Sequence, residues 1–97
     1  MKSLNEIIEI LNKHKENLKE KYGVIEIGIF GSYAKDAQKE SSDVDILVEF
    51  EAPVSLLKIV SLENYLSDLI GIKVDVVPKK NIRVELKDEI LREAITI

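Results

Sequence analysis

The sequence contains no cysteine and only one histidine, and this scarcity removes several kinds of chemistry. Without thiols the chain can form neither disulfide bonds nor a thiolate metal site, and it has no thiol nucleophile. A single histidine in the absence of cysteine argues against a zinc centre. A protein without disulfides is suited to a reducing compartment, so we expect a cytoplasmic location.

Long apolar runs are also absent. No stretch approaches the ~20 apolar residues that span a membrane, and the N-terminal "MKSLNEIIEILNKHKENLKEKYG" is too charged for a signal peptide. The 14 basic and 18 acidic residues give a formal net charge of −4. Nonspecific binding to nucleic acid relies on clustered Lys and Arg, so we expect neither that activity nor a membrane partner. The charge balance still permits a single nucleotide held through metal ions.

The composition favours one small soluble domain. Of the 97 residues, 45% are hydrophobic and 33% are charged, which is typical of a globular protein rather than a disordered one. A chain of this length is expected to bury one modest core. We therefore interpret residues 1–97 as a single domain.

Hydrophobic periodicity predicts alternating helices and strands. Apolar residues at steps of three and four from Leu4 to Tyr22 indicate a first helix, which Gly23 would end. Strands are predicted over 24–30, 43–50 and 72–77, and helices over 55–70 and 84–95. The last helix is expected to face inward through Leu86, Ile90, Leu91 and Ala94. This order predicts an α/β (α+β) fold in which helices cover a small mixed β-sheet.

Three aspartates stand where strands normally exclude charge. Asp43 and Asp45 open the run "DVDILVEF" and, two residues apart, point to the same face of a strand. Asp75 lies inside "IKVDVV" and can meet the pair if the two strands are neighbours. Clustered carboxylates repel one another unless cations lie between them. Their oxygens are suitable ligands for Mg²⁺, and two such ions can assist phosphoryl displacement.

A glycine-serine turn follows the first predicted strand. Gly31 lets the backbone approach a ligand closely, and Ser32 offers a hydroxyl beside free backbone N–H groups, as the N-cap of a short helical turn over "SYAKDA". Such a turn suits the phosphates of a nucleoside triphosphate, toward which Lys35 could add positive charge. Tyr33 has two alternatives, exposure next to the phosphates or packing in the core.

Each feature has a simpler interpretation when taken alone. An isolated Gly-Ser is usually only a turn, an isolated Asp-x-Asp is more often a solvated strand end, and Asp75 could lie on an exposed edge strand. Their occurrence in this order, at strand ends of one short α/β chain, favours a site for metal and phosphate.

The stretch "GSYAKDAQKESSDVDILVEF" resembles the pattern of the polymerase-beta-type nucleotidyltransferase superfamily, in its minimal nucleotidyltransferase (MNT) branch. The resemblance covers nearly the whole chain and implies the fold of that superfamily. It implies that Gly31 and Ser32 hold the triphosphate and that Asp43, Asp45 and Asp75 are catalytic carboxylates that bind Mg²⁺. Where the family commonly has Arg-Gly, this chain has Lys35 and Asp36. Lysine lacks the planar fork of arginine, whereas aspartate tolerates a left-handed backbone better than most residues.

Proteins of the MNT branch are often encoded beside a helical HEPN protein, and the two form a toxin–antitoxin pair. The resemblance therefore implies an antitoxin that transfers AMP from ATP, with Mg²⁺, to a hydroxyl of a HEPN-type toxin, with which it could form an oligomer. The alternative is a non-catalytic antitoxin that binds and masks its partner. Aminoglycoside nucleotidyl transfer and glycosyl transfer are disfavoured, because the chain is too small for the additional domains they need.

Overall fold

The computed structural model describes residues 2–97, and its N-terminal part forms two helices where one was predicted. Helix α1 (Leu4–Lys13) and helix α2 (Lys15–Tyr22) are separated at His14, whose backbone leaves the helical region. No apolar residue lies between Leu11 and Leu18 to hold the middle of this segment against the sheet. Each short helix instead buries its own pair of side chains, and Gly23 ends α2 in a left-handed conformation, as predicted.

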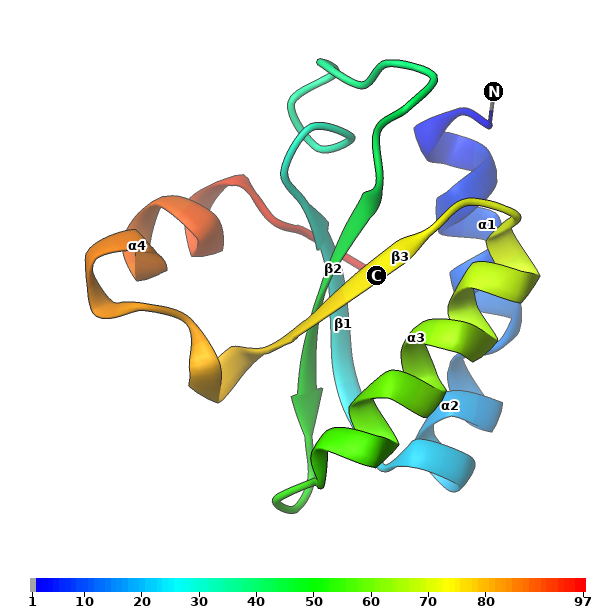
Figure 1. Ribbon diagram of the computed structural model, residues 1–97, viewed down its shortest axis with the longest axis vertical. Helices are drawn as coiled ribbons and strands as arrows, with labels where there is room; N and C mark the ends of the chain where they lie inside the picture. The colour runs from blue at the N-terminus through cyan, green and yellow to red at the C-terminus, as the bar shows by residue number, and fades with distance from the viewer. Residues whose placement is uncertain (1) are drawn as a thin grey trace.

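A four-stranded mixed sheet forms the centre of the molecule (Figure 1), which confirms the predicted fold class. Its strands are β1 (Val24–Phe30), β2 (Val44–Phe50), β3 (Val74–Pro78) and β4 (Ile95–Thr96). In space they follow the order β3-β2-β1-β4. Strand β1 pairs antiparallel with both β2 and β4, whereas β2 and β3 are parallel. The two-residue strand β4 was not predicted, because so short a segment carries no readable alternation.

Helix α3 (Leu56–Ile70) is the crossover that makes β2 and β3 parallel. Its N-cap is Ser55, whose hydroxyl accepts a hydrogen bond from the Lys58 amide, and Gly71 ends it with a positive φ of 78°. A hydrogen bond joins this helix to the sheet, because the Glu63 carboxylate accepts from the Val76 amide at 2.8 Å. The crossover therefore brings the beginnings of β2 and β3 to the same edge of the sheet.

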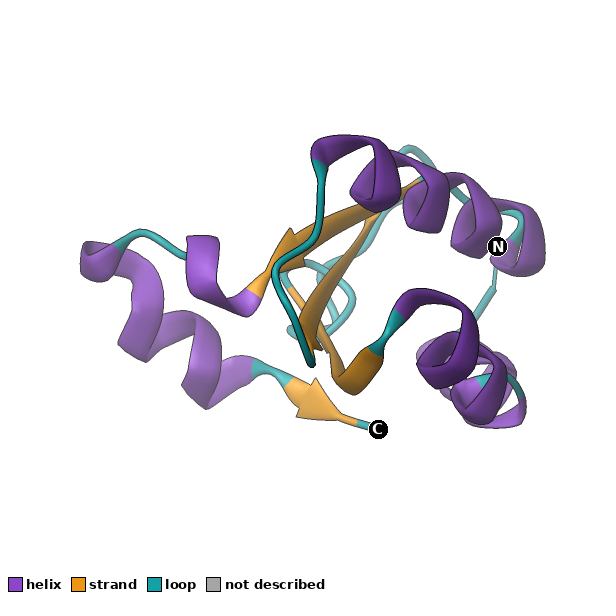
Figure 2. Ribbon diagram, turned by 90° about the horizontal axis from the view of Figure 1, so that it is seen from below, coloured by secondary structure: helices purple, strands orange, loops and turns teal. Residues whose placement is uncertain are grey.

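The two faces of the sheet have different coverings. Helices α1, α2 and α3 lie on one side of the sheet and α4 (Val84–Glu93) on the other (Figure 2). The core lies between the sheet and the first three helices and is made of apolar side chains from both. The strands contribute Ile27, Ile29, Val44, Ile46, Val48, Val74 and Val76. The alternate residues face the α4 side and include Asp45 and Asp75.

Helix α4 packs loosely, contrary to the predicted inward face. It follows a short 3-10 helix (Lys79–Asn81) and has no buried residue. Of the four side chains expected to face inward, Leu86 is 43% exposed and Leu91 is 38% exposed. Their apolar spacing is correct for an amphipathic helix, but the helix covers a face of the sheet that carries charged side chains. None of the helices formed by residues 2–97 has the length and apolar character needed to cross a membrane.

Candidate active site

Asp45 and Asp75 face each other across the two parallel strands. Their Cα atoms are partners in the β2–β3 register, and neighbouring strands lie about 4.8 Å apart. Both side chains are partly buried and project on the α4 side of the sheet. The position predicted for Asp75, beside the aspartate pair, is therefore the one that the structure shows.

Asp43 lies just before β2, next to the other two aspartates along the same edge. Its side chain is 40% exposed, and its Oδ2 atom lies 3.7 Å from the Lys73 Nζ atom. The backbone hydrogen bonds between β2 and β3 extend to this point, because the Val44 amide donates to the Lys73 carbonyl. Asp43 thus has a cationic neighbour of its own, and an incoming metal ion would have to compete with it.

Negative charge concentrates around Asp45. Partial burial raises the pKa of its carboxyl group, and the nearby carboxylates of Asp75, Asp43 and Glu93 raise it further. Across residues 2–97 no three acidic or histidine side chains converge closely enough to make a ready metal site. The donors are nevertheless hard oxygens with excess negative charge between them, which is the chemistry that suits a hard divalent cation.

Gly31 begins the turn that faces this cluster. Its φ of 73° lies in the left-handed region, and a Cβ atom added there would overlap the Asp45 carboxylate. Only glycine therefore satisfies both the backbone conformation and the close approach to Asp45. The sequence argument that a glycine is needed for a close backbone approach holds at this position.

The segment after Gly31 is a series of turns that includes one helical turn, as predicted, and does not continue as a helix. The Lys35 amide donates to the Gly31 carbonyl, and the Ala37 amide donates to the Ser32 carbonyl at 2.8 Å. Asp36 has a φ of 56°, which ends any helical progression. Ser32 therefore does not act as a helix N-cap. The left-handed conformation at Asp36 agrees with the tolerance expected of aspartate at this position.

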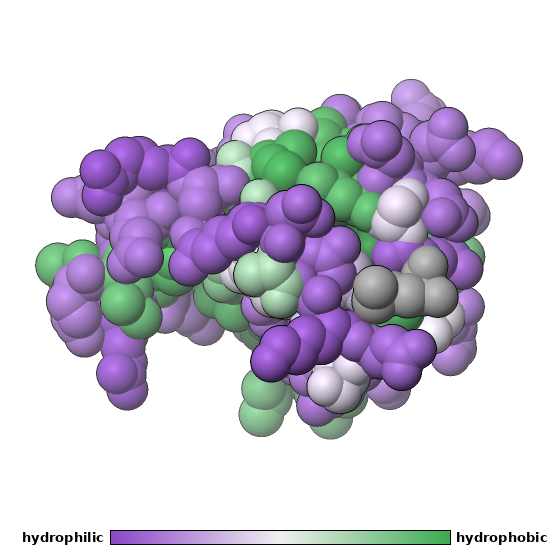
Figure 3. All heavy atoms as spheres, turned by 90° about the horizontal axis from the view of Figure 1, so that it is seen from above, coloured by the Kyte–Doolittle hydropathy of each residue, from purple (hydrophilic) through white to green (hydrophobic). Residues whose placement is uncertain are grey.

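Tyr33 fixes the turn to the core. Its side chain is buried, with 1% of its surface exposed, so the packing alternative is correct. The rest of the turn and the following loop lie at the end of the molecule above the sheet, where the surface is mainly hydrophilic (Figure 3). A buried anchor beside a polar loop holds Gly31 in place while its neighbours stay accessible to solutes.

Glu93, at the end of α4, is a site residue that the sequence did not reveal. Its Oε1 atom accepts a hydrogen bond of 3.0 Å from the Gly31 amide, and its Oε2 atom lies 3.3 Å from the Lys35 Nζ atom. In the sequence Glu93 is one of several charged residues on an exposed helix. Only the return of the chain through β4, next to β1, brings it to the turn.

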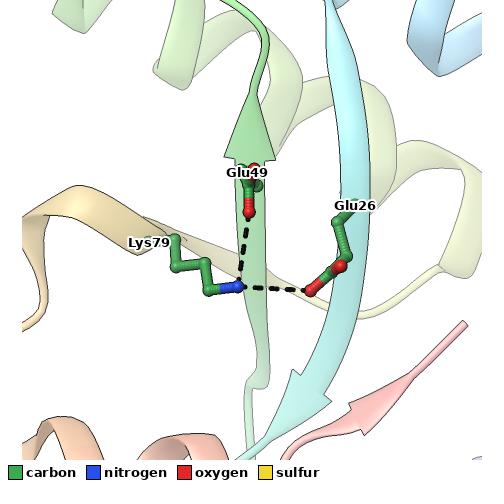
Figure 4. A network of polar contacts seen from close by, with 3 residues as sticks. All are labelled: Glu26, Glu49 and Lys79. Carbon is green, nitrogen blue, oxygen red and sulfur yellow. Dashed lines mark hydrogen bonds and ion pairs between the residues drawn. The ribbon is translucent and has the colours of Figure 1, made fainter.

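A second polar cluster occupies the same face nearer the other end of the strands. Lys79 bridges Glu49 at 3.3 Å and Glu26 at 3.4 Å (Figure 4). Its hydrogen bond to Glu49 and the charge of Glu26 raise the pKa of the Lys79 ammonium group. Beside it is a groove lined largely by apolar residues, at the ends of β2 and β3 remote from the aspartates. The Lys79 ion pairs join the end of β3 to β2 and β1. Both the ion pairs and the groove lie away from the aspartate cluster.

Comparison with known proteins identifies the family. The model of the "Nucleotidyltransferase domain" family matches residues 11–97. The chain is 48% identical to protein adenylyltransferase MntA of Thermococcus cleftensis over 97 residues, covering 100% of this chain and 98% of the relative. It is 63% identical over 82 residues to a Methanocaldococcus jannaschii protein provisionally named a protein adenylyltransferase, covering 84% of each chain.

Solved structures share the fold. A chain provisionally described as a minimal nucleotidyltransferase is 33% identical, with a TM-score of 0.79, covering 95% of this chain and 94% of the other. A toxin–antitoxin complex with AMP-PNP matches with a TM-score of 0.72 at 23% identity, covering 95% and 69%. A complex of a tri-AMPylated Shewanella oneidensis HEPN toxin with its MNT antitoxin matches with a TM-score of 0.62 at 21% identity, covering 95% and 66%. The chain therefore belongs to the nucleotidyltransferase domain family, in its branch of minimal nucleotidyltransferases.

Proposed function

We propose that this nucleotidyltransferase transfers AMP from ATP to a hydroxyl group of a HEPN-type helical protein and thereby acts as its antitoxin. The observation that carries the proposal is the pairing of Asp45 with Asp75 in one register, directly beside the Gly31 turn. The names of the relatives support the same reaction, since the MntA relative is called a protein adenylyltransferase. The AMPylated HEPN toxin in a structural neighbour supports the partner.

The transfer is a displacement at the α-phosphorus of ATP. The acceptor oxygen forms a bond to that phosphorus, the bond from phosphorus to the bridging oxygen of the β-phosphate breaks, and pyrophosphate leaves. The acceptor proton passes to a carboxylate, for which Asp75 is the candidate because it is partly buried and has no cationic partner among residues 2–97. Gly31, Ser32 and Lys35 would bind the phosphates through an amide, a hydroxyl and an ammonium group.

Mg²⁺ fits the aspartate cluster chemically. Asp43, Asp45 and Asp75 would hold it. Burial raises the pKa of Asp45, the neighbouring carboxylates raise it further, and such an ion would neutralise their negative charge. When bound, Mg²⁺ supplies neutralisation of charge on the triphosphate and the leaving pyrophosphate. The protein's own contribution is to hold the carboxylates at one sheet edge and the phosphate-binding turn next to them.

The experiment combines the protein with its helical partner and ATP labelled at the α-phosphate. Transfer of label to the partner is expected from the native chain and should be lost in Asp45→Asn and Asp75→Asn. Asp68→Asn is the matched control, because Asp68 is an exposed aspartate of α3. Neutralisation of the partner is measured in the same samples.

A second candidate function is a non-catalytic antitoxin that masks its partner. The contact of Glu93 with Gly31 and Lys35 favours it, because that contact occupies donors that a triphosphate needs. Neutralisation that persists in Asp45→Asn without any transfer of label would establish this candidate and refute the enzymatic one.

A further inference from the structure

Glu93 contacts the turn over residues 31–36, called the phosphate turn below, in the way that two oxygens of a bound phosphate would. One carboxylate oxygen accepts from the Gly31 amide at 3.0 Å, and the other lies 3.3 Å from the Lys35 ammonium group. The Glu93 side chain is 17% exposed and that of Lys35 is 53% exposed, so the carboxylate is largely shielded from water whereas the ammonium group is not. A carboxylate and a phosphate are both anionic acceptors and recognise the same donors.

The contact and a bound triphosphate exclude one another. The Gly31 amide carries a single proton, and its hydrogen bond to Glu93 uses it. Glu93 also places negative charge close to Asp45, where the phosphates and their metal ions would lie. A triphosphate that uses the Gly31 amide must therefore displace the Glu93 carboxylate from it, and it must also compete with Glu93 for the Lys35 ammonium group.

Helix α4 is built so that such a displacement costs little. It lies on its own side of the sheet (Figure 2), has no buried residue, and leaves Val84 86% exposed. Beyond Glu93 it is attached through the two-residue strand β4, which pairs with β1 at Gly28 and Ile29, and through the Ile97 amide, which donates to the Ile27 carbonyl at 2.9 Å. Elements with few buried apolar contacts open at low free-energy cost.

We propose that Glu93 is an internal competitor for the nucleotide, and that α4 acts as a latch which closes the phosphate turn until a nucleoside triphosphate displaces it. The latch rests on the proposed nucleotidyl transfer, since it regulates the same site. Its function would be to satisfy the Gly31 amide in the empty enzyme and to make binding selective for a strongly anionic ligand. Weak anions would fail to replace a carboxylate that is already in place.

The test measures binding of magnesium α,β-methylene-ATP, whose carbon bridge between the α- and β-phosphates cannot be cleaved by the transfer, by calorimetry to the native chain and to three variants. Glu93→Ala removes both contacts, and Glu93→Gln keeps an acceptor for the Gly31 amide but loses the charge. Glu89→Gln removes one charge from an exposed position a helical turn earlier in α4 and is the matched control. We expect Glu93→Ala to bind about three- to tenfold more tightly, because one charged hydrogen bond no longer competes. Glu93→Gln should be intermediate and Glu89→Gln unchanged.

Amide hydrogen exchange at Gly31 provides a second readout that needs no transfer activity. In the native chain without nucleotide this amide should be protected, and protection should fall in Glu93→Ala and return when magnesium α,β-methylene-ATP is added. Equal affinity of the native chain and Glu93→Ala would overturn the latch alone and leave the proposed function intact. Weaker binding by Glu93→Ala would also overturn it and make Glu93 a ligand of the nucleotide or its metal. If even the native chain binds no nucleotide, the latch and the proposed function fall together.

Discussion

At the residue scale, the site depends on the absence of a side chain at position 31. A Cβ atom there would overlap the Asp45 carboxylate, and the positive φ would add strain of about 1–2 kcal/mol. We expect Gly31→Ala to lower the free energy of unfolding by about that amount and to reduce AMP transfer about a hundredfold or more, since Asp45 must move. Urea unfolding and transfer of the α-phosphate label measure the two effects.

Gly23 offers a matched control for that substitution. It also has a positive φ, 70°, but its added Cβ atom would meet only Glu51, at 3.8 Å, an ordinary contact. Gly23→Ala should therefore show the same loss of stability with nearly full activity. Equal losses of activity in the two variants would mean that the overlap with Asp45 has no catalytic consequence.

The charge of Asp45 gives stability a defined dependence on pH. Because the pKa of this carboxyl group is raised in the folded protein, the folded state binds its proton more tightly than the unfolded chain does. The stabilisation from protonation is complete below the ordinary value of 3.8 and is lost as the pH rises through the folded pKa. Asp45→Asn should thus be more stable than the native chain at pH 7, and the difference should shrink toward pH 4.

Urea unfolding at several pH values measures this difference. Asp68→Asn, at an exposed position of α3, serves as the control for the loss of one negative charge. Added Mg²⁺ should stabilise the native chain more than Asp45→Asn, because binding to the folded state alone raises stability. A native chain that is as stable as Asp45→Asn at pH 7 would contradict the charge concentration described for the site.

At the element scale, α3 sets the register that brings Asp45 and Asp75 together, and its first turn is held by Ser55. The Ser55 hydroxyl accepts from the Lys58 amide at 3.2 Å, so Ser55→Ala should lower the free energy of unfolding by about 1 kcal/mol. Activity of the folded variant should be preserved, because the cap is at the end of the helix remote from the aspartates. Ser41→Ala, in the exposed loop before β2, is the control and should change neither quantity.

Elements with strong periodicity were predictable, and those fixed by tertiary contacts were not. Strand β1 was predicted with its observed limits, and α3 within one residue. The break at His14 was missed because residues 4–22 keep a helical spacing throughout. Helix α4 begins at the predicted Val84 but ends at Glu93, and Ile95, which was predicted to be helical, belongs to β4. Its inward face was wrong at Leu86 and Leu91, which are exposed, since spacing shows that a helix is amphipathic and not whether a partner surface exists.

The site was predictable to the extent that strand neighbours could be guessed. Asp75 was expected beside Asp45 on the condition that their strands are neighbours, and the parallel pairing of β2 with β3 meets that condition. Glu93 could not be found in this way. Its place at Gly31 depends on β4, a strand of only two residues. In addition, nothing in the sequence distinguishes Glu93 from the exposed acidic residues of α4.

At the scale of the whole molecule, the aspartate edge of the described chain is open to an incoming acceptor. The described chain has one sheet, three helices behind it and one loosely packed helix in front, and no further lobe covers the aspartate edge. Holding two bound groups in a near-attack geometry supplies a large part of the rate gain in a transfer between them. Under the proposed function, the surface that positions the acceptor hydroxyl would come from the partner protein.

Release of pyrophosphate from ATP should therefore depend on the partner. We expect the protein alone, at saturating Mg-ATP, to release pyrophosphate at least about a hundredfold more slowly than with the helical partner present, because water is the only acceptor and is not positioned. A coupled pyrophosphate assay measures both rates, and Asp75→Asn with the partner present shows the background. Equal rates with and without the partner would mean that this chain positions an acceptor by itself, and the acceptor would then have to be sought among small molecules.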